Sequence, residues 1–214
     1  MLRVFKVTSP MSVGSWVLVI SGGASNTAAV LELLDVLRPV RWAAEVVSFL
    51  AGPPLTTYTG TLLADTAIPV WHEARRELPW LFGASAAASA GAATALFLDP
   101  EEAGPARRLA IGGAVGALAW KRAMRRRLGF AGEVYEHGAA GTFDRVSKAC
   151  TAAGAAMLAL RGKRSRTALV GGSALVLAGE LALRWSVFRA GFQSARDPKY
   201  TTVPQRERLA SRRG

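Results

Sequence analysis

The stretch that decides the fold is VTSPMSVGSWVLVISGGASNTAAVL, from Val7 to Leu31, in which 25 consecutive residues carry no charge. A hydrocarbon core roughly 30 Å thick is crossed by about 20 mostly apolar helical residues, so this stretch is long enough to span a bilayer. It is also longer than the apolar region of a secretory signal peptide, and it lacks a convincing cleavage site. The stretch therefore predicts a transmembrane helix.

Further uncharged runs follow along the chain. Val46–Ala64 holds 19 uncharged residues and Leu78–Leu98 holds 21. Three shorter runs hold 12 or 13 each: Leu109–Trp120, Ala149–Leu160 and Thr167–Gly179. These are long enough to span if the flanking Lys and Arg side chains extend to the membrane interface. We predict an all-α integral membrane bundle of six helices over residues 1–195, followed by a polar, basic tail over 196–214. The spans are expected near 11–33, 42–65, 78–98, 105–122, 147–162 and 167–189.

The charge balance is strongly basic. The 214 residues include 27 Lys and Arg against 15 acids, a net charge of +12, which alone would suggest a nucleic-acid-binding protein. Six spans place both termini on one side, and the segments expected there carry 19 of the 27 basic residues. Positive residues are retained in the cytoplasm, so we expect both termini inside a bacterial-type cell (inner) membrane, with no nucleic-acid partner.

The alternative is a soluble, Ala-rich helical bundle, which the mean hydropathy of only +0.22 leaves open. Tryptophan placement favours the membrane, because this side chain prefers the headgroup level. Five of the six tryptophans lie at or near predicted span ends: Trp42, Trp71, Trp80, Trp120 and Trp185. Small residues predict close helix packing within the bundle, through Gly112 and Gly116 in the fourth span.

Residues for metal or haem chemistry are scarce. His72 and His137, the only histidines, fall in loops between spans, and Cys150 is the only cysteine. A membrane haem takes axial ligands that project from helices, and an iron–sulfur cluster takes about four cysteines. We therefore predict no haem, no metal and no self-contained catalytic site in this chain.

Polar residues in the second span carry a possible binding function. Gly52-Pro53-Pro54 predicts a helix break, and Thr56-Thr57-Tyr58-Thr59-Gly60 follows it, with Asp65 near the span end. Freed carbonyls, hydroxyls and the Tyr58 phenol could line a polar cavity and hydrogen-bond a quinone carbonyl. The alternative is a proline kink in a packed helix, with Tyr58 bonded to a local carbonyl.

The last span contains two opposite charges. Glu180 and Arg184 are four residues apart, so they share a helix face and can form an ion pair. Such a pair inside a bundle can relay protons or can only set the helix register, and both readings stay open.

Three stretches that bracket nearly the whole chain carry a family resemblance. The first is Leu2-Arg3-Val4-Phe5-Lys6 leading into Thr8–Trp16. The second is Tyr58-Thr59-Gly60 through Leu62-Leu63-Ala64 to Pro69-Val70-Trp71, with Leu78-Pro79 and Leu81-Phe82. The third is Arg184-Trp185, Arg189-Ala190-Gly191, Asp197-Pro198-Lys199-Tyr200-Thr201 and Pro204-Gln205-Arg206. In this order they resemble the NrfD / polysulfide reductase membrane-subunit family.

The resemblance implies the membrane subunit of a respiratory oxidoreductase. Such subunits pass electrons between menaquinone or ubiquinone and an iron–sulfur, ferredoxin-like partner subunit, and they hold no haem. A molybdopterin-type catalytic subunit usually completes the complex. The resemblance places Tyr58 at the quinone site, with Asp65 and Thr59 as further quinone-binding candidates.

The resemblance also implies eight helices in two four-helix bundles, and this sequence begins just before the family's third helix. We hypothesise that the first two helices are missing through an incomplete gene model or a truncated gene. The alternative functions are a non-redox membrane protein (a permease fragment or structural anchor) and a non-functional truncated remnant.

Overall fold

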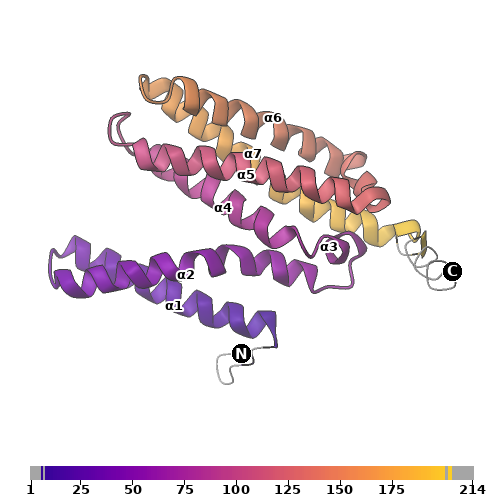
Figure 1. Cartoon of the computed structure of the whole chain (residues 1–214), viewed down its shortest axis with the longest axis horizontal. Coiled ribbons are helices and arrows are strands. Elements are labelled where there is room, and N and C mark those ends of the chain that lie inside the picture. The colour runs from indigo at the N-terminus through magenta and orange to yellow at the C-terminus, as the bar shows by residue number, and fades with distance from the viewer. Residues whose placement is uncertain (1–5, 7, 201, 204–214) are drawn as a thin grey trace.

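Helices make up the regular structure of the chain (Figure 1). A computed structural model describes residues 6, 8–200 and 202–203, and these contain no β-strand. The long helices are α1 (Pro10–Leu33), α2 (Arg38–Ala64), α4 (Leu78–Ala95), α5 (Gly104–Leu128), α6 (Gly138–Leu160) and α7 (Arg166–Arg196). Two short elements join them: α3 (Pro69–Glu73) and the 3₁₀ helix η1 (Gly129–Tyr135). The all-α prediction is confirmed for this part of the chain.

Local sequence signals explain where the first and last helices begin. The Ser9 side chain accepts a hydrogen bond from the Ser12 backbone N–H, and Pro10 occupies the first helical position. Ser165 caps α7 in the same way by accepting from the Ala168 N–H. A serine cap satisfies one of the N–H groups that a helix start leaves unpaired, and proline has no N–H to lose there.

Each predicted span falls on one long helix, but the last three helices extend further at one end of the molecule. The fifth helix continues to Leu128, the sixth begins at Gly138, and the seventh runs on to Arg196. Basic residues at the end of α5 face the negative end of the helix dipole, which favours continuation of the helix. Charge therefore ends the apolar span without ending the helix.

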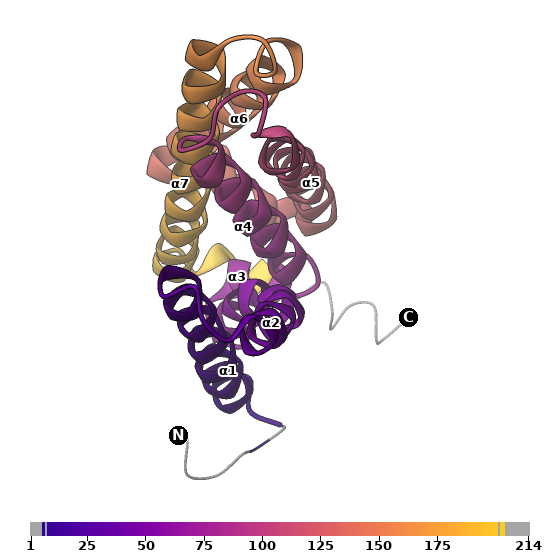
Figure 2. The same ribbon diagram turned by 90° about the vertical axis from the view of Figure 1, so that its left-hand side faces the viewer.

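The helices form two groups (Figures 1 and 2). Helices α4 to α7 pack into a bundle, and α1 and α2 form an antiparallel hairpin beside it. The hairpin packs on the bundle where α2 approaches α4 closely: a Cβ on Gly60 would lie 2.7 Å from the Leu78 carbonyl oxygen. The start of α1, the end of α7, α3 and the α5–α6 connection lie at one end, which we name the basic end (Figure 1).

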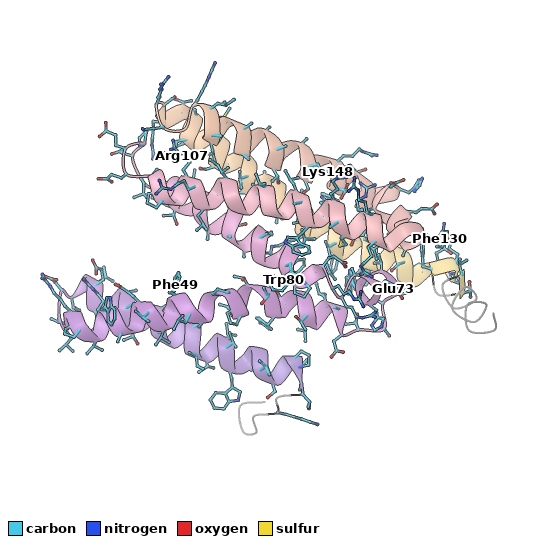
Figure 3. The ribbon with its side chains drawn as sticks, viewed as in Figure 1. Phe49, Glu73, Trp80, Arg107, Phe130 and Lys148 are labelled. Carbon is cyan, nitrogen blue, oxygen red and sulfur yellow. The ribbon has the colours of Figure 1, made fainter. Side chains whose placement is uncertain are left out.

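The core of the described bundle is largely apolar, but polar side chains are buried within it and many large apolar side chains lie outside. The buried polar residues of α4, α6 and α7 include Ser85, Ser147, Thr151, Ser173 and Glu180. Of the large apolar side chains outside, Phe49 of α2, seen in Figure 3, is 78% exposed and Leu181 of α7 is 68% exposed. Soluble proteins bury such residues and rarely expose continuous apolar surface.

By length and apolarity, two of the described helices, α1 and α7, could cross a membrane. Half of the most apolar window of α7 is buried within the bundle, whereas only 6% of the corresponding window of α1 is buried. These two helices support membrane association; the six-span topology remains a prediction.

Two details of the predicted packing are wrong. Gly112 faces open space, whereas Gly116 does approach α4, where a Cβ would lie 3.3 Å from the Ala84 Cβ. The closest approach is made by Gly113, where a Cβ would lie 2.2 Å from the Ala88 backbone nitrogen of α4. Trp71 of α3 is buried rather than at an interface, and its indole Nε1 donates to the Val187 carbonyl of α7 at 2.9 Å. The glycine at position 191 leaves room for this ring, since a Cβ there would lie 2.2 Å from it.

Candidate functional site

Tyr58 lies at the seam between α1 and α2. Its half-buried ring covers Gly14 of α1, where a Cβ would lie 2.3 Å from the ring carbon Cδ2. Only a glycine at that position leaves space for the ring. Within the described part of the chain, the Tyr58 hydroxyl has no hydrogen-bond partner, so it is free to donate to a bound molecule.

The predicted helix break before Tyr58 is wrong, because α2 continues through Pro53 and Pro54. Each proline lacks an N–H and so leaves one carbonyl of the preceding turn unbonded. The Thr57 and Thr56 hydroxyls donate to the Pro53 carbonyl at 2.9 and 3.0 Å. These hydroxyls stabilise the helix backbone after the prolines and do not line a cavity with Tyr58.

Asp65 and Thr59 do not gather around the Tyr58 phenol. Asp65 is the exposed residue that ends α2, seven residues beyond Tyr58 and so about 10 Å further along the axis. Thr59 is half-buried and is turned roughly 100° around the helix from Tyr58. Of the three candidates, Tyr58 alone faces the α1–α2 seam through a contact that the structure defines.

Glu180 and Arg184 are engaged by different partners. Glu180 is buried in the α4–α7 bundle, where its Oε1 accepts from the Thr151 hydroxyl of α6 at 3.1 Å. Arg184 is exposed, and its guanidinium lies 5.0 Å from the centroid of the Phe82 ring. No direct ion pair joins these two described side chains. The carboxylate and the guanidinium therefore contact different partners, although they share one helix.

The residue pattern did not reveal a cluster of charges between α5 and α6. Lys121 Nζ lies 2.9 Å from Asp144 Oδ1, and it donates to the Ser147 hydroxyl at 3.1 Å. The other oxygen of Asp144 pairs with Lys148 at 2.6 Å and with Arg125 at 3.3 Å. We call Lys121, Arg125, Asp144 and Lys148 the α5–α6 ion cluster.

One face of α6 connects this cluster to the interior of the bundle. Asp144, Ser147 and Thr151 are spaced by three and four residues, all are buried, and such residues lie above one another on a helix. Thr151 bonds Glu180, so polar groups run from the basic end to the middle of α7. The spacing of these three residues can be read from the sequence and predicts a polar face on α6. It does not predict which helix packs against that face.

A second pair of charges joins the start of α4 to the end of α5. The Arg127 guanidinium bonds the buried carboxylate of Glu77, with Nη2 at 2.6 Å from Oε2. This hydrogen bond raises the pKa of Arg127. The residue that precedes α4 is thereby tied to the basic last turn of α5.

Beside the ion cluster, Tyr135 of η1 is fully buried and its hydroxyl lacks a partner among the described residues. Burial, aided by the negative charge of Asp144, raises the pKa of the Tyr135 phenol. The phenol therefore stays neutral next to a group of fixed charges.

Parts of the family resemblance lie outside the described residues, namely positions 2–5, Thr201 and Pro204-Gln205-Arg206. Comparison of the chain with protein-family models, curated proteins and solved structures finds no match. Function is therefore inferred from the residues and their geometry.

Proposed function

We propose that the chain is the quinone-interacting membrane subunit of a respiratory oxidoreductase. In this role it passes electrons between an iron–sulfur partner subunit and menaquinone or ubiquinone. The observation that carries the proposal is the Tyr58 phenol, held over Gly14 at the α1–α2 seam with its hydroxyl unbonded by the described residues. A phenol O–H can donate to a quinone carbonyl, whose charge grows as the quinone is reduced.

Membrane placement is the first part of the proposal. Its support is the outward position of residues such as Phe49 and Leu181, together with many small residues and some polar ones among the buried apolar side chains. Lipid gives no hydrophobic drive for helix association, so small residues that allow close backbone contact supply the packing instead. All six long helices then cross the bilayer, and the basic end faces the cytoplasm by the positive-inside rule.

The buried groups of the α4–α7 bundle have a supporting role in this proposal. Glu180 lies inside the bundle, connected through Thr151 and the face of α6 to the α5–α6 ion cluster. Carboxylates within a membrane bundle mark proton routes or fixed structural contacts. Quinone chemistry consumes or releases protons, and Glu180 is the carboxylate best placed to exchange them inside the bundle.

A non-redox anchor or permease fragment is the second candidate, and a separate observation favours it. The buried charges lie in α4–α7, whereas Tyr58 lies at the seam of the hairpin, so no single described site contains both. In that case the polar row on α6 only sets helix register or lines a transport path.

The test uses the full chain co-expressed with an iron–sulfur and a molybdopterin-type subunit. Tyr58→Phe should abolish most quinone turnover while the complex still assembles, because only the hydroxyl is lost. Tyr135→Phe is the matched control, since it removes a hydroxyl far along the chain and should leave turnover unchanged. Unchanged turnover in Tyr58→Phe contradicts the quinone role, and failure to assemble with any redox subunit favours the second candidate.

A further inference from the structure

A cavity of about 600 Å³ opens between α5 and α6 at the basic end. Five cations from the two helices surround it: Lys121, Arg122, Arg125, Arg126 and Lys148. Glu136 is the acidic side chain in its lining. Figure 3 shows Lys148 between α5 and α6, toward the basic end of the molecule.

The cavity keeps an excess of positive charge. Asp144 is shared by Lys121, Arg125 and Lys148, and Glu136 pairs with Arg125. Arg122 and Arg126 are exposed and form no ion pair within the described part of the chain. They are four residues apart on α5, so both guanidinium groups lie on one helix face. Two carboxylates therefore balance five cations.

Buried contacts hold part of this charge in place before any ligand binds. The side chains of Lys121 and Asp144 are almost inaccessible, and Asp144 draws Lys148 of α6 toward the two α5 cations. Cations from two helices are thus directed to one space by a shared carboxylate. A ligand that binds there loses less free energy to ordering the side chains.

The ligand chemistry follows from the mixed walls of the cavity. Guanidinium and ammonium groups bind phosphate oxygens through charge-assisted hydrogen bonds. Leu118 of α5 and Ala152 of α6 form an apolar wall one turn further from the basic end. Basic pockets between membrane helices on the cytoplasmic side are typical of sites for anionic lipid headgroups.

We infer that this cavity binds the phosphate headgroup of an anionic phospholipid, whose acyl chains lie on the apolar surface between α5 and α6. The inference rests on the proposed membrane placement but not on the quinone role. Basic segments are attracted to anionic lipid in general, whereas this inference names one defined site, which includes Lys148. The Lys148 side chain enters through the tertiary fold, because 26 residues separate it from Arg122.

The test measures lipid retention by the full chain, purified in detergent, with native mass spectrometry. Phosphatidylglycerol and phosphatidylcholine are supplied in equal amounts, and a separate arm supplies inorganic phosphate. One stoichiometric phosphatidylglycerol should be retained in preference to phosphatidylcholine. The double variant Arg122→Gln/Arg126→Gln should bind it about 25-fold more weakly, since each cation near a membrane surface contributes about fivefold.

The matched control is Lys163→Gln/Arg164→Gln, which removes two exposed cations at the opposite end. Equal losses in both double variants would reduce the effect to net charge and overturn the site. Binding of inorganic phosphate without a preference for phosphatidylglycerol would overturn the lipid assignment. A chain that stays in solution without detergent or membranes would instead refute the membrane placement itself.

Discussion

Lys121 of α5 and Asp144 of α6 form an ion pair with Nζ and Oδ1 2.9 Å apart, although their side chains are only 3% and 1% exposed. The desolvation of two such charges offsets most of their attraction, so the pair is weak support for stability. We expect its effect to be specificity, because a carboxylate of α6 that is buried against Lys121 favours one register of α6 on α5. The helix register in turn positions the cations around the cavity.

Asp144→Asn tests this pair directly. The substitution leaves Lys121 buried without its counter-charge, and breaking a buried pair in this way costs roughly 3–5 kcal/mol. We expect a lower unfolding temperature of the full chain in detergent, measured by tryptophan fluorescence. Glu136→Gln is the control, because the Glu136 side chain is 55% exposed and its pair with Arg125 contributes at most about 1 kcal/mol. Similar losses in the two variants would contradict a special role for Asp144.

The neighbouring glycines of α5 give opposite predictions. Gly113→Ala places a Cβ 2.2 Å from the Ala88 nitrogen, so α4 and α5 must move apart. Such overpacking costs about 1–3 kcal/mol or more. Gly112→Ala meets nothing within 4 Å and should be neutral or stabilise by about 0.5–1 kcal/mol, because alanine favours the helix. Thermal unfolding of both variants checks the sign, and equal destabilisation would refute the packing.

Tyr135 predicts a loss of stability in alkali. Burial raises its pKa, so above pH about 10 the unfolded chain releases this proton while the folded chain retains it. The buried phenol therefore does not lower the free energy of unfolding below that pH. Above it, the free energy of unfolding falls by up to about 1.4 kcal/mol per pH unit. Tyr135→Phe should lose less stability than the parent between pH 9 and 11, measured by denaturant unfolding. Parallel curves for the two proteins would contradict the burial of the phenol.

Leu181→Lys tests the membrane placement. Leu181 is exposed at the middle of α7, and a lysine at the centre of a spanning helix costs about 2.5–3.5 kcal/mol of insertion free energy. We expect less chain in the membrane fraction and a lower unfolding temperature. Leu34→Lys is the control, since Leu34 is exposed in the turn that follows α1. Normal behaviour of both variants would favour the soluble alternative.

Much of the helical structure was predictable because the signals are local. An uncharged run such as Val7–Leu31 predicts a helix over its own residues, and the serine–proline pair near its start marks where that helix begins. Proline was the exception. Gly52-Pro53-Pro54 looks like a break, yet neighbouring threonine hydroxyls bond the Pro53 carbonyl and the helix continues. The carbonyls that the two prolines leave without an N–H partner are those of Phe49 and Leu50, so the threonine bonds support the backbone after the prolines and do not replace the lost ones.

The candidate site was predictable only in part. Tyr58 could be selected from its own neighbours, but its contact with Gly14 required α1 to fold back on α2. Glu180 and Arg184 share a helix face by spacing, yet Thr151 and Phe82 from other helices engage them separately. Side-chain partners inside a bundle depend on interhelical packing, which spacing along one helix does not specify.

By itself, the sequence determined the order and approximate limits of six long helices and the concentration of basic residues at alternate span ends. These follow from the absence of charge over each run and from its length, which are properties of contiguous residues. Only the tertiary structure decided that Gly113 rather than Gly112 packs, that Trp71 is buried, and that Lys121 meets Asp144. Burial depends on contacts between helices that are distant in the chain. From the sequence alone, Lys121 could therefore lie in solvent at the end of a span or be buried against α6.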